Sequence, residues 1–140
     1  MARSWRIAAA VVGALGLALS GGCGARHSEP QYLYGVPNVE AIEVTIGGGS
    51  TVRVNAVVRG TVRDLCTRIN SVRQSLDGSD FSLTLTTRRA LADVCADVET
   101  PFEATIPLVV RGLEPGSYTV TAGDVSTPFE YERGGMAPQL

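Results

Sequence analysis

Three cysteines, Cys23, Cys66 and Cys95, are the side chains with the clearest chemical potential in this sequence. A thiol can close a disulfide, hold a metal, act as a nucleophile or accept a covalent group. Cys66 and Cys95 are too far apart for a CxxC motif and too few for a pair of zinc knuckles. Redox and zinc chemistry are therefore disfavoured for this pair, whereas Cys23 could be a spare thiol, half of a disulfide or an attachment point.

Motifs of known catalytic classes do not occur. The sequence contains no GxSxG, HExxH or Walker-type glycine loop. Its one histidine, His27, precedes the domain and has no second metal ligand nearby, so the domain has no histidine to activate a serine or cysteine. We therefore expect a protein that is not an enzyme and has no cofactor and no resident metal.

Three acidic residues, Asp93, Asp97 and Glu99, lie around Cys95. We interpret them as a solvated loop, and weak calcium binding by their oxygens is the alternative. The run "DGSD" at 77–80 also resembles part of a calcium loop, but a hairpin turn explains it better because further spaced ligands are missing.

The N-terminal segment differs in composition from the rest of the chain. Arg3 and Arg6 precede an uncharged apolar run at residues 7–19, which is shorter than the roughly 20 residues of a membrane-spanning helix. This pattern is typical of an export signal. We predict a signal peptide over residues 1–22.

Cys23 follows that segment directly, in the stretch "LSGGC" at residues 19–23. The stretch resembles the lipobox of bacterial lipoprotein signals, with Ser20 where the family usually has leucine. The resemblance implies that Cys23 is lipidated, for example with palmitate, and anchors the protein at the extracytoplasmic face of the cell membrane. The alternative is ordinary secretion with a thiol near the cleavage point.

If Cys23 carries a lipid, Cys66 and Cys95 remain as an even pair. Disulfides persist in the oxidising compartments outside the cytoplasm, so we predict a bridge between these two residues. On the chain-entropy account, such a bridge stabilises the fold by about 3–4 kcal/mol.

The remaining chain is long enough for one domain. Residues 23–38 are polar and contain Pro30, Gly35 and Pro37, so we predict that they form a tether. Within this tether, Tyr32, Leu33 and Tyr34 either dock onto the domain edge or stay free. Residues 39–133 form the predicted domain, and residues 134–140 a disordered tail.

Apolar and polar residues alternate with period two through most of the domain, which predicts half-buried strands. Six segments show the alternation clearly: 42–46, 52–58, 81–85, 102–108, 118–122 and 125–131. A seventh, at 67–74, is less regular and could be a helix, as could a turn around Cys95. Gly123 and Asp124 predict a tight hairpin, and Pro107 predicts an edge strand or a bulge. About seven short antiparallel strands at this spacing indicate a two-sheet sandwich.

The stretch "GLEPGSYTVTAG" at 112–123 narrows the fold. Leu113, Pro115, Gly116, Tyr118 and Val120 resemble the corner sequence of fibronectin type III and related immunoglobulin-like domains. That resemblance implies an all-β, immunoglobulin-like two-sheet antiparallel sandwich in which the Tyr118 hydroxyl is hydrogen-bonded. Such a layout, a lipobox followed by one domain with one disulfide, is similar to that of small bacterial lipoproteins.

Charge is distributed unevenly along the chain. Without residues 1–22 there are ten arginines against fourteen acidic residues, so nucleic-acid binding is not expected. Residues 53–92 hold seven arginines and three aspartates, whereas residues 93–140 hold eight acids and two arginines. Either neighbouring strands pair these charges, or a basic face could meet anionic lipid or an acidic partner. The candidate residues are Arg53, Arg59, Arg63, Arg68, Arg73, Arg88 and Arg89.

Two functions from different classes fit these patterns. We favour a membrane-anchored, non-enzymatic binding or structural module of the cell envelope, whose partner is another envelope protein or polymer. The alternative is a secreted inhibitor, for example of proteases, or a carrier of a small ligand.

Overall fold

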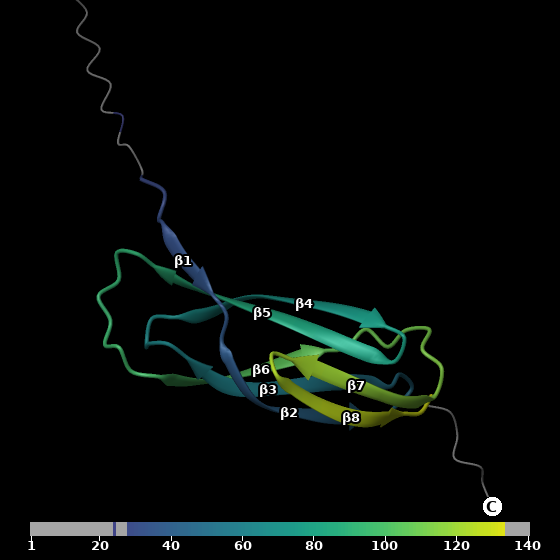
Figure 1. Cartoon of the computed structure of the whole chain (residues 1–140). Coiled ribbons are helices and arrows are strands. Elements are labelled where there is room, and N and C mark those ends of the chain that lie inside the picture. The colour runs from purple at the N-terminus through teal and green to yellow at the C-terminus, as the bar shows by residue number, and fades with distance from the viewer. Residues whose placement is uncertain (1–23, 25–27, 134–140) are drawn as a thin grey trace, which may run out of the picture.

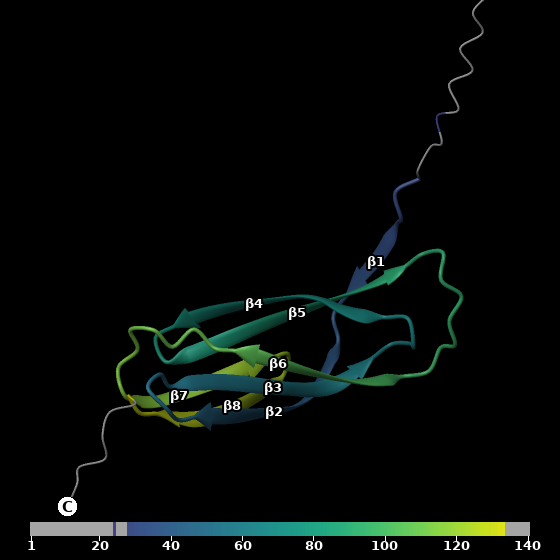
Figure 2. The same ribbon diagram turned by 180° about the vertical axis from the view of Figure 1, so that it is seen from behind.

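The computed structural model describes residue 24 and residues 28–133, which fold into eight β-strands in two sheets. The strands are β1 (Tyr32–Gly35), β2 (Asn38–Gly47), β3 (Arg53–Val62), β4 (Arg68–Asp77), β5 (Asp80–Ala90), β6 (Thr100–Pro107), β7 (Gly116–Ala122) and β8 (Val125–Tyr131). The two sheets lie face to face, as Figures 1 and 2 show from opposite sides. The fold is therefore a two-sheet, all-β sandwich, as predicted.

The larger sheet, sheet A, is built around β5. One edge of β5 pairs with β4 along most of its length. The other edge pairs with β1 through residues 87–90 and with β7 through residues 80–83, and β8 continues the sheet beyond β7. β5 therefore lies inside sheet A, and its alternate side chains from Phe81 to Thr87 are buried, the apolar ones in the core that the two sheets share.

The smaller sheet, sheet B, has three antiparallel strands in the order β2-β3-β6. β3 is central, and its inward residues Val54, Ala56 and Val58 are almost completely buried. Gly60 of β3 leaves no room for a side chain, since a Cβ atom there would meet the carbonyl oxygen of Asn38 in β2 at 1.9 Å. Pro107 ends β6, and β6 is an edge strand, which confirms the prediction made for that proline.

One pairing differs from the antiparallel arrangement that was predicted. β5 and β7 run parallel over four residue pairs. The chain leaves sheet A after β5, runs back through β6 in sheet B, and returns to sheet A as β7. After these two changes of sheet, β7 runs in the same direction as β5. The periodicity within a single strand contains no information about the direction of its neighbour.

The uncertain seventh segment is a strand. Residues 68–77 form β4, with a bulge between Ile69 and Ser71 that explains the broken alternation there. Helix was the competing prediction for that segment and for the stretch around Cys95, and the structure assigns a helix to neither. The part of the chain that the structure describes contains no helix that could span a bilayer.

The described chain contains one strand that periodicity did not predict, and it lies inside the expected tether. β1 pairs with β5, with Tyr34 opposite Arg88, and the Leu91 amide donates to the Gln31 carbonyl at 2.9 Å. A strand of four residues is too short to display a period. Docking of Tyr32–Tyr34 onto the domain edge is thus confirmed, and the domain begins earlier than residue 39.

The predicted corner at Tyr118 is present. Its hydroxyl donates to the Glu114 carbonyl at 2.7 Å, and its ring lies 5.8–6.3 Å from the rings of Phe81, Phe129 and Tyr131. Gly123 adopts a φ of 58° in the predicted hairpin between β7 and β8. These features support the immunoglobulin-like description of the sandwich.

Candidate functional site

One end of the sandwich holds most of the polar chemistry. It comprises β1, the connection at residues 63–67 and the connection at residues 91–99, and we call it the entry end because the chain enters the fold there. After β8 the chain leaves at the opposite end (Figure 1). The predicted signal peptide at 1–22, Cys23, His27 and the predicted tail at 134–140 lie outside the described residues.

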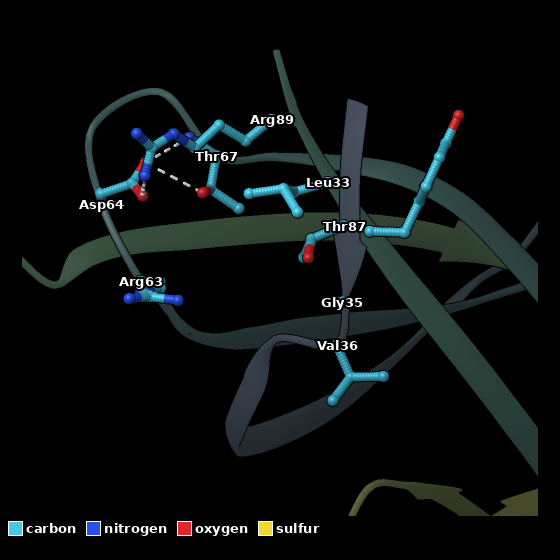
Figure 3. Close-up of a pocket in the computed structure, with 9 residues that line it drawn as sticks. Leu33, Gly35, Val36, Arg63, Asp64, Thr67, Thr87 and Arg89 are labelled. Carbon is cyan, nitrogen blue, oxygen red and sulfur yellow. Dashed lines mark hydrogen bonds and ion pairs between the residues drawn. The ribbon is translucent and has the colours of Figure 1, made fainter. Parts of the chain in front are cut away.

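A buried carboxylate organises the first of these connections. Asp64 is 1% exposed, and its Oδ1 atom accepts hydrogen bonds from the Cys66 amide at 3.0 Å, the Thr67 amide at 2.8 Å and the Thr67 hydroxyl at 2.9 Å. Its Oδ2 atom accepts from Arg89 Nη1 at 2.8 Å (Figure 3). All but one of these donors belong to the sequence Asp64-Leu65-Cys66-Thr67, so the loop closes on its own carboxylate.

Burial and hydrogen bonding act in opposite directions on this carboxylate. Burial of Asp64 acts to raise its pKa, but the hydrogen bonds from Thr67, the Cys66 amide and Arg89 outweigh it, so the pKa lies below its ordinary value of 3.8. Asp64 therefore stays ionised at neutral pH and its acceptor positions are occupied. This is the environment of a structural carboxylate and not of a general base.

Arg89 joins the two connections of the entry end. It reaches Asp64 in the first connection, and its Nη2 atom donates to the Asp93 carbonyl in the second at 3.1 Å. The predicted Cys66–Cys95 disulfide is present and links the same two connections, with a Cα–Cα distance of 6.0 Å. One covalent bond and one ion pair, in which Asp64 is buried and Arg89 is half-buried, thus hold both loops in place.

A small cavity lies beside this ion pair. It measures about 130 Å³ and is lined by β1 together with Thr67, Thr87 and Arg89 (Figure 3). Pockets that enclose drug-sized ligands measure roughly 300–1,000 Å³, so this cavity suits ordered water or a very small ion at most. It contains no histidine or cysteine thiol, and the one carboxylate in it is fully engaged.

The seven candidate arginines do not share one face. Arg53 and Arg59 lie on the outer face of sheet B, where Arg59 pairs with Glu43 at 2.9 Å and with Glu103 at 2.7 Å. The pKa of Arg59 is raised by these two hydrogen-bonded carboxylates. The cross-strand pairing considered for these charges therefore holds for Arg59.

The other arginines lie with sheet A and its loops. Arg68 pairs in register with Arg88, and β4 carries Arg73 further along. Arg63 faces Asp97 at 3.9 Å, and Arg89 is turned inward against Asp64. Of the seven, Arg68 and Arg88 are neighbours on the outer face of sheet A, and Arg73 lies further along the same face.

The acidic residues near Cys95 are spread along the 91–99 connection. No group of three or more His, Cys, Asp or Glu side chains placed to hold a metal ion occurs within residue 24 and residues 28–133. Asp97 instead faces Arg63, and Asp93 contributes its backbone carbonyl to Arg89.

A second feature lies along the side of the sandwich, on β4. Val72 and Leu76 pair in register with the buried residues Leu85 and Phe81 and so point toward sheet B, yet they are 36% and 40% exposed. They are exposed because sheet B ends at β6 and does not extend beneath β4. We call Val72 and Leu76 the β4 ledge.

Gln74 spans the gap beneath the ledge. Its Nε2 atom donates to the Pro107 carbonyl at 3.0 Å, and its Oε1 atom accepts from the Val109 amide at 3.0 Å. One side-chain amide thus makes the pair of hydrogen bonds that a neighbouring strand residue would make. Within the described residues, no strand pairs with the outer edge of β4.

Sequence reasoning missed Asp64 and Gln74. Asp64 could have been noticed because an aspartate three residues before a threonine in a turn commonly caps the loop amides. Gln74 gives no such signal, since its role depends on the distance between two sheets.

Comparison with known proteins gives a family and distant relatives. Residues 56–131 match the family described as the ORF11 beta-sandwich domain. The chain is 28% identical over 88 residues to the "Uncharacterized 10.2 kDa protein in HgiCIIM 5'region" of Herpetosiphon aurantiacus, covering 63% of this chain and 93% of that protein. It is 30% identical over 74 residues to the "Uncharacterized 10.2 kDa protein in HgiBIM 5'region" of the same organism, covering 53% of this chain and 89% of that protein. No solved structure matches.

Proposed function

The chain belongs to the ORF11 beta-sandwich domain family, and on that premise we propose that it is a non-enzymatic binding or structural module of the bacterial cell envelope. In this proposal a lipid on Cys23 holds it at the extracytoplasmic face of the membrane. The partner is another envelope protein that supplies an extended segment. The β4 ledge is the observation that carries the proposed binding role.

The ledge combines two features that favour strand addition. β4 is a ten-residue edge strand, and an edge strand presents backbone donors and acceptors to which a further strand can pair. The side chains of Val72 and Leu76 offer an uncovered apolar surface next to that edge. A partner segment with alternating apolar residues would pair with β4 and cover both side chains at once.

The bulge at Asn70 limits where such a partner could pair. It lies between Ile69 and Ser71, and a bulge bends and twists the strand that carries it. The regular stretch of β4 that follows, residues 71–77, contains both ledge residues. We therefore assign the proposed partner strand to this half of β4.

Site-directed photocross-linking in living cells tests the proposal. A photoreactive amino acid replaces Leu76 on the ledge, and in the matched control it replaces Thr45, which is exposed on the outer face of sheet B. We expect a discrete cross-linked protein from position 76 that is lost when Val72→Glu is added. Equal adducts from both positions, or none from position 76, would contradict the proposal.

A second candidate, a carrier of a small ligand, has one observation in its favour. An open depression of about 470 Å³ at the end opposite the entry end is lined by apolar residues that include Val52, Leu108, Val110 and Leu113. Its volume lies in the range of roughly 300–1,000 Å³ typical of ligand pockets. Native mass spectrometry of the purified protein tests this candidate, and a spectrum without added mass at the domain would remove it.

A further inference from the structure

Exposed aliphatic side chains are concentrated at the entry end. Of the ten exposed large aliphatic residues in the described chain, five lie on its three segments and a sixth, Val36, directly follows β1; the five are Leu33, Leu65, Leu91, Val94 and Val98. β1 and the two connections reach this same end in both views of the molecule (Figures 1 and 2). A cluster of this kind, unlike scattered apolar residues, indicates a surface that contacts something.

These apolar residues are displayed on loops that are held in place. Leu65 and Val94 each directly precede a cysteine of the Cys66–Cys95 disulfide. Val94 is fully exposed, at 101%, although its neighbour Cys95 is bridged and the Asp93 carbonyl accepts from Arg89. The disulfide and the Arg89 hydrogen bond thus hold the two loops in a conformation in which Leu65 and Val94 are exposed to solvent.

The position of Cys23 limits what this end can reach. Eight residues lie between Cys23 and Tyr32, the first residue of β1, and the nine Cα–Cα steps that join the two span at most about 30 Å. This step rests on the proposed lipid anchor. With the anchor in a bilayer, the entry end stays within about 30 Å of lipid, and a short tether raises the local concentration to the millimolar range, so even a weak contact is populated.

The polar side chains of the entry end suit a bilayer surface. Tyr32 and Tyr34 lie on β1 beside Arg88, whose guanidinium is 5.0 Å from the centre of the Tyr32 ring. Tyrosine favours the interface between lipid and water, and the guanidinium group pairs well with phosphate.

The charge of the entry end does not favour anionic over neutral lipid. The entry end carries as many arginines as acidic residues, four of each: Arg63, Arg68, Arg88 and Arg89, and Asp64, Asp93, Asp97 and Glu99. Because the two signs balance, the attraction is apolar and does not depend on anionic lipid.

We propose that the entry end rests on the phospholipid bilayer that holds the anchor, with Leu65, Val94 and Val98 entering the lipid–water interface. The sandwich then stands with its opposite end pointing away from the membrane. The β4 ledge, on the side of the sandwich, stays accessible to a partner.

Tryptophan fluorescence tests this orientation. The chain from residue 23 onward contains no tryptophan, so Val94→Trp introduces a single reporter at the entry end. Val109→Trp is the matched control, because Val109 is also exposed, at 64%, and lies in the connection at the opposite end. Each variant of the chain from residue 23 is coupled at Cys23 to a maleimide lipid in vesicles of neutral phosphatidylcholine. Chemical coupling supplies the tether whether or not cells lipidate Cys23, so the failure of the anchor and the failure of this inference can be told apart.

Brominated lipid provides the readout. We expect quenching of the Val94→Trp emission that exceeds that of Val109→Trp by about twofold or more, together with a blue shift, because tryptophan at this position enters the interface. Adding Leu65→Ser and Val98→Ser should reduce the quenching. Replacing part of the neutral lipid by anionic lipid should leave it unchanged.

Three outcomes would overturn the inference. Equal quenching of both variants would mean that neither end prefers the membrane. Quenching that needs anionic lipid would mean that charge, and not the apolar residues, causes the contact. No quenching of Val94→Trp, with a cross-link from position 94 to a second copy or to another protein, would assign this end to a protein partner.

Discussion

Removing the Cys66–Cys95 disulfide should destabilise the domain without unfolding it. The double variant Cys66→Ser, Cys95→Ser releases a cross-link between residues that are 29 positions apart. On the chain-entropy account, a loop of that length contributes about 3.6 kcal/mol, because the unfolded chain regains the freedom that the bridge removes. A typical domain has a total stability of about 5–15 kcal/mol, so the loss is large but can be survived.

The native loops should remain docked in this variant. Arg89 still joins Asp64 to the Asp93 carbonyl, and the amides of Cys66 and Thr67 still donate to Asp64 after the cysteines are replaced. The substitutions therefore lower the free energy of unfolding mainly by raising the entropy of the unfolded state. Circular dichroism of the variant should match that of the wild type.

Urea denaturation measures the loss. With a slope of about 1.5–2 kcal/mol per molar urea, a loss of 3.6 kcal/mol lowers the midpoint by about 2 M. Reduced wild-type protein should behave like the double variant. A loss below about 1 kcal/mol would refute the reasoning, since it would mean that the bridge does not restrict the unfolded chain. A variant that does not fold at all would show that Arg89 and Asp64 cannot hold the loops.

Three further changes test the packing and electrostatics of the sandwich. Tyr118→Phe should fold and lose about 0.5–1.5 kcal/mol, toward the lower limit because the Glu114 carbonyl lies near solvent, whereas Tyr118→Ala should lose about 3–5 kcal/mol, both measured by urea denaturation. Gly60→Ala should cost about 1–3 kcal/mol or more in thermal unfolding, because the added methyl group would meet the Asn38 carbonyl at 1.9 Å. The lowered pKa of Asp64 means that its stabilising contribution is complete above pH 3.8 and is lost as the pH falls through its folded-state pKa, so acid should destabilise the wild type more steeply than Asp64→Asn. An unchanged midpoint for Tyr118→Phe or Gly60→Ala, or parallel acid profiles for Asp64→Asn and wild type, would contradict the respective assignment.

The strands could be predicted because alternation reports burial directly. Segments such as Val54–Val58 and Phe81–Leu85 have one buried face, and the same pattern defines it in the sequence and in the fold. The corner at Tyr118 and the hairpin at Gly123 were predictable because each depends on a few neighbouring residues.

Features that depend on distances between strands could not be predicted. The β4 ledge exists because sheet B has one strand too few to cover Val72 and Leu76, and no local pattern records the width of a sheet. Arg89 was grouped with the exposed arginines because its partner Asp64 is 25 residues away. The disulfide was predictable for a different reason, since after Cys23 is assigned to the anchor only two cysteines remain.

The proposed lipid on Cys23 would determine both where the protein acts and which of its ends can meet the membrane. Metabolic labelling with radioactive palmitate, followed by membrane fractionation, tests it most directly. We predict that the label enters the wild-type chain in the membrane fraction and does not enter Cys23→Ala, which should be released from the membrane. Equal labelling of both chains, or unlabelled wild-type protein in the soluble fraction, would contradict the claim.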